Sequence, residues 1–437
     1  MNNIKHSVIL ERNKCVGCTN CIGHCPTEAI RVRQGKACIL DERCIDCGEC
    51  IRVCPHHAKR AQSDALTDIQ RYDFTVAIPA PTLYGQLGDK YSIDRILTAL
   101  KKLGFDAIFE AAEAADIVTA KLKEMLKEKT DPLPWISSSC PAIIRLIQRR
   151  FPSLLEQIVR LEAPMEVAAR IVKQELYPDK KNIGVFFISP CPAKITAVKN
   201  PIGAQSSAVD GVISISEIFL PLQNAAANLS EVEPLGRASI KGVNWARSEG
   251  ESQATEWAGT VAVDGIVNVI NFLEELENGK TTYADFIEVM ACPGGCVGGA
   301  LTVENPYICK ARIIRKAGKI NREARERGKT PLRQQLIMME SEIPPVQGLT
   351  LDADVHTAAE KMARIQQYTE ELPGLDCSSC GAPTCAALAE DIVAGTAKKN
   401  DCIFILREEI IILTEGLAEL GSWMPPLLSK ESRKKDE

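Results

Sequence analysis

Residues 286–300 read FIEVMACPGGCVGGA, and this stretch decides how the rest of the chain is interpreted. Cys292 and Cys296 stand four positions apart, with glycines at 294, 295, 298 and 299 around them. Two thiols cannot complete the four-ligand site that thiolate-bound metals prefer. The stretch therefore predicts a metal site whose other ligands come from distant parts of the chain.

Cysteine content is the unusual feature of the composition. The chain has 437 residues, which is enough for two to four domains, and 18 of them are cysteines. The start of the chain has no signal-peptide pattern, and no apolar run is long enough for a membrane helix. We therefore expect a cytoplasmic protein, in which clustered cysteines bind metal rather than form disulfides. A net charge of −5 gives no reason to expect nucleic acid as a partner.

Two cysteine runs near the start share one spacing. Residues 15–26 read CVGCTNCIGHCP and residues 44–55 read CIDCGECIRVCP, and in the bacterial ferredoxin run of this form the fourth cysteine binds the other cluster. The alternative, a zinc knuckle, would not require two complete runs that each end in proline. Between them, a short hairpin turning at Gly35 is expected. The motif predicts one 4Fe–4S cluster on Cys15, Cys18, Cys21 and Cys54, and a second on Cys25, Cys44, Cys47 and Cys50.

A third group of cysteines lies near the end of the chain. Residues 376–402 contain a loop shaped by Gly381 and Pro383, and Thr384 is placed to cap a helix that starts near Cys385. The segment resembles a small 4Fe–4S domain found in several redox proteins of anaerobes, with a zinc site as the alternative. The expected ligands are Cys377, Cys380, Cys385 and Cys402.

Two more cysteines follow strand-like runs in the middle of the chain. Cys140 follows LPWI and three serines, Cys191 follows IGVFFI and Ser-Pro, and each cysteine is followed by proline. Loops at the carboxyl ends of strands in an α/β sheet meet in one crevice. Together with Cys292 and Cys296 they supply four thiolates, so the sequence predicts a cluster site assembled from three loops.

These three loops resemble those of the iron-only (FeFe) hydrogenase catalytic domain. The third loop matches that family's Phe-x-Glu-x-Met-Ala-Cys-x-Gly-Gly-Cys-x-x-Gly-Gly almost throughout, and the resemblance spans about residues 73–320. It implies that Cys140, Cys191, Cys292 and Cys296 hold a 4Fe–4S cube. It also implies a reason for the glycines of the third loop, Gly294 and Gly295 among them: the cofactor lies against the backbone, where a Cβ would collide with it. It implies further that Cys296 bridges to a diiron subcluster with CO, cyanide and a bridging azadithiolate. The residues that it implies around the subcluster are Lys194, Met290, Glu288, Ser139 and Pro81.

The chain departs from the family pattern where protons should move. Ser139 stands where the usual enzymes have a cysteine, Ala163 where they have a serine, and Ala197 where they have a glutamate. Positioned proton-transfer groups typically contribute about 10²–10⁴ in rate. We therefore expect slow, reversible conversion of H2. The pattern resembles the branch of FeFe hydrogenases associated with hydrogen sensing, in the group without a PAS domain.

The expected fold is α/β, with four segments. These are a ferredoxin-like 2×(4Fe–4S) module at 1–63, a catalytic domain of two α/β lobes with the cofactor between them at 73–325, a helical 4Fe–4S domain at 353–405, and a helix with a polar tail at 406–437. Residues 246–256, ARSEGESQATE, are expected to form a surface insertion rather than a lid. The apolar helix at 403–420 is expected to pack against the body, with a dimer or partner helix as the alternative.

The cofactors implied are three accessory 4Fe–4S clusters and the H-cluster. The expected partners are H2, protons and a redox partner such as a ferredoxin or a signalling protein, with a homodimer as an open alternative and no membrane. The alternative function is an iron–sulfur electron-transfer or interaction protein without the diiron subcluster, as in the hydrogenase-like proteins of eukaryotic iron–sulfur assembly.

Overall fold

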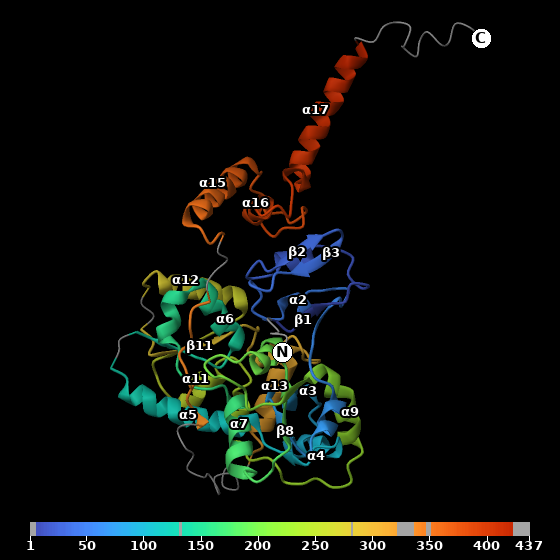
Figure 1. The fold of residues 1–437 in the computed structure, drawn as a ribbon. Helices are drawn as coiled ribbons and strands as arrows, with labels where there is room; N and C mark the ends of the chain where they lie inside the picture. The colour runs from blue at the N-terminus through green and yellow to red at the C-terminus, as the bar shows by residue number, and fades with distance from the viewer. Residues whose placement is uncertain (1–5, 131–132, 281–282, 321–335, 347–350, 423–437) are drawn as a thin grey trace, which may run out of the picture. The chain divides into compact units, whose positions relative to one another are not determined.

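The computed structural model describes residues 6–130, 133–280, 283–320, 336–346 and 351–422. The chain forms two compact units, one of residues 1–14 and 40–348 and the other of residues 15–39 and 349–437 (Figure 1). The first ferredoxin-type cysteine run therefore belongs to one unit and the second run to the other. The expected end of the catalytic domain at 325 and the polar tail after 422 lie outside the described residues.

A four-stranded parallel sheet forms the centre of one lobe of the first unit. Its strand order is β6-β5-β8-β9, with β5 at Phe74–Pro79, β6 at Ala107–Ile108, β8 at Ile183–Ser189 and β9 at Gly211–Ser214. β8 reads IGVFFIS and is buried from its second residue onward. Such a continuous apolar run is typical of a parallel strand covered on both faces.

A three-stranded parallel sheet forms the second lobe. Its order is β10-β11-β7, with β7 at Trp135–Ile136, β10 at Thr260–Asp264 and β11 at Phe286–Met290. All five residues of β11 are buried. The two lobes confirm the α/β architecture that the sequence predicts.

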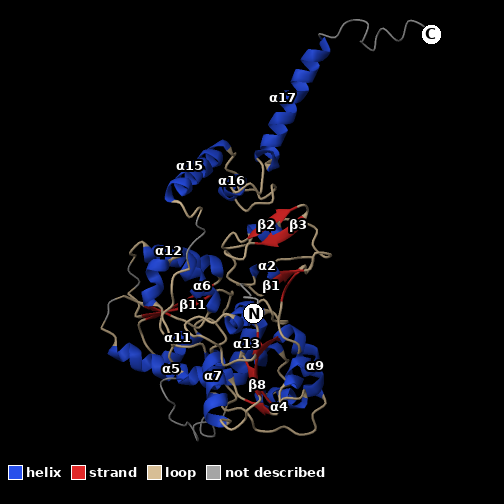
Figure 2. Cartoon of the chain, viewed as in Figure 1, coloured by secondary structure: helices blue, strands red, loops and turns tan. Residues whose placement is uncertain are grey.

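Helices surround both sheets (Figure 2). Proline begins α6, α7, α8 and α13, a position where its missing N–H costs no hydrogen bond. The described helices of the first unit are α2 (Glu49–Arg52), α3 (Thr82–Gln86), α4 (Ile93–Lys102), α5 (Ala111–Glu128), α6 (Pro141–Arg150), α7 (Pro164–Ile171), α8 (Pro192–Lys199), α9 (Ile215–Ala227), α10 (Ile240–Asn244), α11 (Gly250–Thr255), α12 (Ile266–Glu277) and α13 (Pro306–Ala317). No described helix has both the length and the apolar character needed to cross a membrane.

Two short antiparallel pairs lie near the ferredoxin-type cysteines. β1 (Val8–Leu10) pairs with β4 (Lys59–Ala61) in the first unit. β2 (Ile30–Arg33) pairs with β3 (Lys36–Ile39) in the second unit, and Gly35 has a φ of 69°. This second pair confirms the hairpin expected to turn at Gly35.

The second unit also contains the carboxy-terminal helices. α1 covers Asn20–Gly23, α15 Val355–Glu371, α16 Cys385–Val393 and α17 Ile403–Ser422. The Thr384 hydroxyl accepts a hydrogen bond from the Ala387 N–H, which confirms the expected cap of α16. A small core that includes Ile365, Leu388 and Cys402 holds α15 and α16 together.

The expectation that residues 403–420 pack against the body is wrong for most of the helix. Only Phe404 and Ile405, at its start, pack against the small core of the second unit. Ile410, Leu413 and Leu417 are 53%, 65% and 69% exposed. An apolar helical period shows that a helix has an apolar face, but it does not show what covers that face.

Candidate functional site

Three of the four mid-chain cysteines stand just after a strand or at the start of a helix. Cys191 follows β8 by two residues, Cys292 follows β11 by two residues, and Cys140 lies four residues beyond β7. Cys140 and Cys191 are the N-cap residues of α6 and α8. Cys296 begins a single 3-10 turn, Cys296–Gly298. The carboxyl ends of strands from both lobes therefore supply the thiols, and helix N-termini favour negative charge beside two of them.

The four thiols lie close enough to interact electrostatically. Burial, together with the charge of the neighbouring Cys140, raises the pKa of the Cys191 thiol to about 11. Burial also raises the pKa of Cys296 to about 12, with Cys191 and Cys140 adding to the shift. The pKa of Cys292 is raised for the same reasons. The sequence-predicted ligands are therefore brought together, and a metal cation would supply the positive charge that four thiolates here require.

Lys194 is a buried positive side chain beside two cysteines of this group. It lies on α8, is 8% exposed, and its Nζ donates to the Ser139 carbonyl oxygen at 3.3 Å. Its charge lowers the thiol pKa values of both Cys191 and Cys296. Lys194 therefore stands where it can donate a hydrogen bond to an anionic group held by these cysteines.

The structure gives a reason, not evident from the sequence, why two positions of the third loop must be glycine. A Cβ on Gly295 would lie 2.4 Å from the Ser248 backbone nitrogen, and one on Gly299 would lie 2.4 Å from the Pro190 carbonyl oxygen. The expected reason was the approach of a cofactor to the backbone. In the described residues, the chain's own backbone occupies the space at these two positions. Gly294 differs, because its nearest neighbour is a Val297 methyl group at 3.6 Å.

Ser139 is hydrogen-bonded to a carboxyl group that the sequence analysis did not identify. The Ser139 hydroxyl donates to Glu251 Oε2 at 3.1 Å, and the Ser137 hydroxyl donates to the same oxygen at 2.6 Å. Glu251 is 3% exposed. The expectation that residues 246–256 form a surface insertion is therefore wrong, because α11 carries this side chain into the protein beside Ser139.

Glu288 forms the second half of a buried carboxyl pair with Glu251. Burial, together with the charge of Glu288, raises the pKa of Glu251 to about 8. Burial also raises the pKa of Glu288 to about 7, although the Ser252 N–H donates to its Oε2 at 2.8 Å. Glu288 Oε1 has no hydrogen-bond partner among the described residues. Both carboxyls can therefore gain and lose a proton near neutral pH.

The remaining predicted residues around the subcluster lie at the ends of secondary structure. Met290 ends β11 and is 4% exposed, and Pro81 is the N-cap of α3. Thr82, the next residue, is fully buried, and its hydroxyl has no partner among the described residues. An unpaired buried hydroxyl next to Pro81 fits a site that receives a polar group. Ala163 is the N-cap of α7 and Ala197 lies within α8, so neither position has a side chain that can carry a proton.

The second ferredoxin-type run packs against the loops of this site. Asp46 is 1% exposed and accepts hydrogen bonds from the Ser7 N–H at 2.9 Å and from the Thr196 hydroxyl of α8 at 2.7 Å. The Arg52 guanidinium donates to the Gly298 carbonyl oxygen at 2.7 Å. A Cβ on Gly48 would lie 2.6 Å from that of Ala300. The segment with Cys44, Cys47, Cys50 and Cys54 is thus fixed to the α8 and glycine loops.

Cys15, Cys18, Cys21 and Cys25 belong to the second unit. The crossed ligand pairing predicted from the motif joins the two units and remains a prediction.

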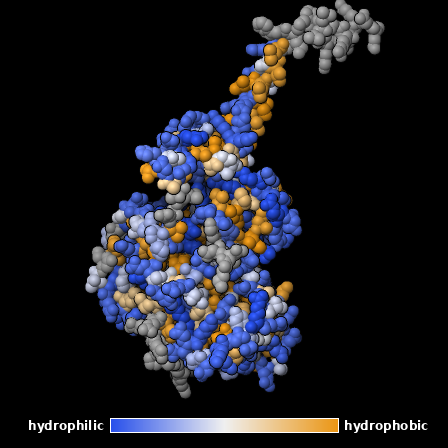
Figure 3. Space-filling model, viewed as in Figure 1, coloured by the Kyte–Doolittle hydropathy of each residue, from blue (hydrophilic) through white to orange (hydrophobic). Residues whose placement is uncertain are grey.

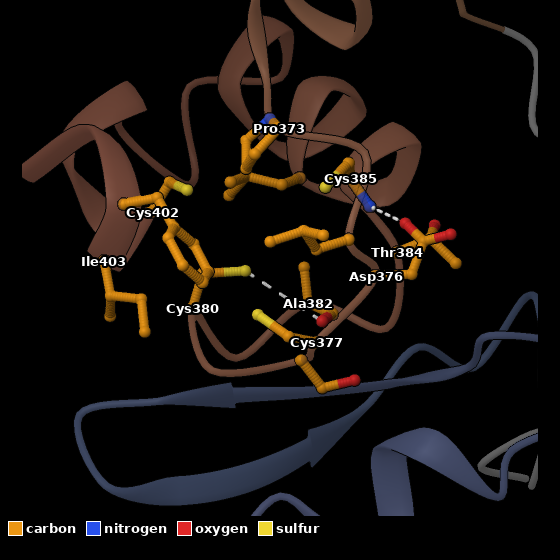
Figure 4. Close-up of a pocket in the computed structure, with 13 residues that line it drawn as sticks. Pro373, Asp376, Cys377, Cys380, Ala382, Thr384, Cys385, Cys402 and Ile403 are labelled. Carbon is orange, nitrogen blue, oxygen red and sulfur yellow. Dashed lines mark hydrogen bonds between the residues drawn. The ribbon is translucent and has the colours of Figure 1, made fainter.

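The carboxy-terminal cysteines line one pocket. Cys377, Cys380, Cys385 and Cys402 surround it, together with apolar residues such as Pro373 and Leu388 (Figure 4). The Cys385 N–H donates to Asp376 Oδ1 at 2.6 Å, which fixes the loop to the start of α16. Burial raises the pKa of Cys380, and a hydrogen bond from Ser379 lowers that of Cys377. Four thiols around an apolar pocket fit a 4Fe–4S cluster.

The buried carboxyl pair predicts how stability depends on pH. The pKa values of Glu251 and Glu288 rise from 4.5 to about 8 and about 7 on folding, so the folded state keeps protons that the unfolded chain has lost. Their contribution to stability is complete below about pH 4.5 and is lost as the pH rises through 7 to 8. Denaturant unfolding should give a lower free energy of unfolding at pH 9 than at pH 6. The difference between the two pH values should be smaller in Glu251→Gln than in the wild type.

Glu256 provides the control for this pH series. It is exposed, and hydrogen bonds from Lys123 and Lys241 lower its pKa to about 2, so it is ionised throughout the range. Glu256→Gln should therefore leave the decline between pH 6 and pH 9 unchanged. An undiminished decline in Glu251→Gln would show that Glu251 is not the titrating group.

Comparison with known families gives three matches. The family model for the iron-only hydrogenase large subunit, C-terminal domain, matches residues 73–259 and 248–300. A 4Fe–4S dicluster domain matches residues 7–55, and a model for an Fe–S cluster domain matches residues 372–404.

The similar curated proteins have two kinds of name. The periplasmic Fe hydrogenase large subunit of Nitratidesulfovibrio vulgaris is 28% identical over 70% of this chain and 88% of its own length. Iron hydrogenase 1 of Clostridium pasteurianum is 26% identical, and this chain spans only 48% of its length. Cytosolic iron-sulfur assembly component 3 of Bos taurus is 24% identical over 52% of this chain and 60% of its own length. Sequence similarity thus extends to hydrogenases and to an assembly protein.

Solved structures agree on the fold. A structure of HydA(deltaEFG), described as revealing stepwise FeFe-hydrogenase H-cluster assembly, has a TM-score of 0.50 and 16% identity, covering 64% of this chain and 98% of that chain. A variant of FeFe-hydrogenase HydA1 from Chlamydomonas reinhardtii gives the same TM-score, identity and coverage. At this identity the likeness supports the fold alone.

Proposed function

Because the chain belongs to the iron-only hydrogenase large-subunit family, we propose that it is a slow FeFe hydrogenase. The reaction is the reversible conversion of H2 into two protons and two electrons. The observation that carries this proposal is the buried Glu251–Glu288 pair beside Ser139. Two buried carboxyls with pKa values of about 7 to 8 suit proton exchange near neutral pH, and a purely structural cluster site does not require them.

The cysteines would divide the cofactor between the two lobes. Cys140, Cys191, Cys292 and Cys296 would hold the cubane part of the H-cluster, and Cys296 would also carry the diiron part. When bound, the diiron part would supply the metal centre at which the H–H bond is broken or formed. Lys194 and Met290 would line its surroundings, with Lys194 donating a hydrogen bond to a cyanide ligand. Gly294 and Gly295 would shape the loop beside it.

Protons would move through Ser139 without ionisation of its hydroxyl group. Its oxygen can accept a proton from the pocket as it releases its own proton to Glu251 Oε2, 3.1 Å away. Glu251 and Glu288 would then exchange protons with the surroundings of α11. A hydroxyl group ionises much less readily than a thiol, so this route should be slower than one that starts at a cysteine.

Electrons would leave through the iron–sulfur clusters. The segment with Cys44, Cys47 and Cys50 is fixed to the α8 and glycine loops by Asp46 and Arg52. This packing supports its cluster as the first acceptor after the H-cluster cubane. The other two accessory 4Fe–4S clusters would complete the chain to a redox partner such as a ferredoxin. Slow turnover with complete electron wiring suits a hydrogen sensor in the cytoplasm of an anaerobe.

The second candidate function is an iron–sulfur protein that never carries the diiron part. The similarity to cytosolic iron-sulfur assembly component 3 favours it, as does the absence of the usual relay residues at Ser139, Ala163 and Ala197. Glu288 argues against it, because a protein that holds only cubanes transfers electrons without protons and has no use for a buried carboxyl at this place.

The experiment that decides between the two is H2-dependent dye reduction. Protein matured with the diiron cofactor should reduce an oxidised viologen under H2 slowly, and CO should inhibit the reaction. Protein that holds the diiron cofactor but neither reduces the viologen under H2 nor evolves H2 from the reduced viologen would contradict the hydrogenase proposal.

A further inference from the structure

The β2–β3 hairpin lies between two cysteine loops of the second unit. On the outer edge of β3, the Ala37 N–H donates to Cys15 Sγ at 3.5 Å, and the Lys36 ammonium donates to the Cys15 carbonyl oxygen. A Cβ on Gly17, in the same loop, would lie 2.6 Å from the Gly35 carbonyl oxygen. The loop of the first ferredoxin-type run is therefore in direct backbone contact with the hairpin.

On the outer edge of β2, the hairpin contacts the carboxy-terminal cysteine loop. The Val32 N–H donates to the Gly381 carbonyl oxygen at 2.8 Å, and the Arg33 guanidinium donates to the Cys380 carbonyl oxygen at 3.2 Å. A Cβ on Gly381 would lie only 2.1 Å from the Val32 carbonyl oxygen. Figure 4 shows the hairpin running beneath the loop that carries Cys377 and Cys380.

The two contacts meet at one residue pair of the hairpin. Val32 and Ala37 are direct partners in the β2–β3 register. Both N–H groups point outward to the cysteine loops, so they form a non-hydrogen-bonded pair, in which Cα atoms are about 4.5 Å apart. A short backbone route thus runs from Cys15 Sγ through Ala37 and Val32 to Gly381 and Cys380.

A buried ion pair holds the hairpin to the carboxy-terminal module. Arg31 Nε lies 2.7 Å from Asp391 Oδ2 of α16, and the Arg31 side chain is 3% exposed. Arg33 pairs with the same carboxylate. A surface contact between mobile neighbours would not require a buried arginine, because such a charge is stable only while its partner stays in place.

We propose that this hairpin is an electron-transfer junction between two clusters. The cluster on Cys377, Cys380, Cys385 and Cys402 would exchange single electrons directly with the cluster that Cys15, Cys18 and Cys21 help to hold. One 4Fe–4S cluster is oxidised by one electron as the other is reduced, and no proton or bond is involved. The inference rests on the cluster assignments of the proposed function, but it does not require the diiron part or H2.

The test separates the hairpin from the module without touching a cysteine. Gly381→Ala adds a methyl group for which the Val32 carbonyl oxygen leaves no room. Gly381 also has a φ of 81°, which a residue with a side chain rarely adopts. Gly374→Ala is the matched control, because its φ is 68° and nothing lies within 4 Å of the added Cβ. Asp391→Asn is a second variant, which breaks the ion pair and leaves the loop backbone unchanged.

The readout is the EPR spectrum of the dithionite-reduced full chain at matched iron and sulfide content. Wild type and Gly374→Ala should show a spin–spin interaction between the carboxy-terminal cluster and the cluster that Cys15, Cys18 and Cys21 help to hold. Loss of this interaction in Cys402→Ser would identify the carboxy-terminal cluster as one of the two partners. Gly381→Ala and Asp391→Asn should lose or weaken this interaction. An interaction absent from the wild type, or unchanged in both variants, would overturn the junction. Lack of H2 activity would leave this result intact.

An independent observation concerns α17. Six of its exposed apolar side chains recur at alternating intervals of three and four residues, and Ile411 and Ile412 are exposed outside this row. Figure 3 shows apolar colour along the helix. Each is between 42% and 69% exposed. The row consists of Ile403, Leu406, Ile410, Leu413, Leu417 and Leu420.

This row has the pattern of a two-stranded coiled coil. Isoleucine at 403 and 410 takes the a positions and leucine at 406 and 413 takes the d positions, the combination that favours parallel dimers. Glu409 at a g position would face Thr414 of the other helix, so a self-pair brings no like charges together. We propose that α17 pairs with α17 of a second copy of this chain.

Light scattering of the full chain tests this pairing. The chain has a mass of 47.7 kDa, and the expected particle has twice that mass. Leu413→Glu should halve the mass, and Ile412→Glu, at an equally exposed residue outside the row, should not. A monomeric wild type at every concentration, or equal disruption by both variants, would contradict the proposal.

Discussion

Replacing Glu251 by glutamine is expected to lower H2 turnover by about 10²-fold or more in both directions. Glutamine keeps the size of the side chain and can still accept the Ser137 and Ser139 hydrogen bonds. It cannot release a proton, so the route from Ser139 to Glu288 is broken. The loss should appear in kcat for H2 evolution and H2 oxidation, with an unchanged complement of iron and diiron cofactor.

Glu256→Gln is the control for the Glu251 substitution. Glu256 lies five residues further along the same segment, is exposed, and pairs with Lys123 and Lys241. Its replacement should leave turnover unchanged. Full activity in Glu251→Gln would show that protons reach the cofactor by another route.

Replacing Gly295 by alanine is expected to prevent stable assembly of the H-cluster site. Gly295 has φ 91° and ψ −159°, a region that is essentially restricted to glycine and costs about 1–3 kcal/mol for other residues. The added Cβ would also lie 2.4 Å from the Ser248 nitrogen and 2.6 Å from the Arg247 carbonyl carbon. Crowding of this kind typically costs a further 1–3 kcal/mol, roughly. The loop that carries Cys292 and Cys296 would therefore have to move.

The effect of Gly295→Ala can be measured as iron bound per chain after reconstitution. Gly279→Ala is the control, since its φ is 81° and nothing lies within 4 Å of the added Cβ. The control should lose some stability and keep all its iron. Gly295→Ala should lose about the four irons of one cubane, the complement of a single 4Fe–4S site. A full iron complement in Gly295→Ala would show that the third loop tolerates displacement.

Much of the fold could be predicted because cysteine spacing and apolar runs are local signals. The runs before Cys140 and Cys191 are strands of parallel sheets, and Thr384 caps the helix that follows it. Parallel strands place their carboxyl ends on one edge of a sheet, which explains why the loops after β7 and β11, with Cys140 and Cys292, lie together. Cys191 follows β8 of the other sheet, and its approach to them depends on how the two lobes pack.

Glu251 could not be found in the same way. Its segment, ARSEGESQATE, has no apolar period, and α11 is a six-residue helix flanked by Glu249 and Glu256 at positive φ. Its burial arises from tertiary contacts, including those with Ser137 and Ser139 of a loop more than a hundred residues away. The usable signal was indirect: a chain that lacks the usual relay residues but keeps the third loop needs another carboxyl near Ser139.

The glycine loop shows a second limit of the sequence. The glycines at 295 and 299 indicate close approach of some group, and the sequence cannot distinguish a cofactor from the chain's own backbone. The same limit applies to α17, because the sequence shows its row of apolar residues but does not show that the row is exposed. In both cases the missing information is the identity of the neighbour, which only the folded chain provides.

The most direct test of the hydrogenase proposal is the infrared spectrum of anaerobically matured protein, in the region where metal-bound CO and cyanide absorb. The proposal predicts bands in this region that shift when H2 replaces an inert atmosphere. Absence of such bands after verified maturation, with four cubanes present by iron and sulfide analysis, would contradict it and leave an iron–sulfur carrier or interaction protein.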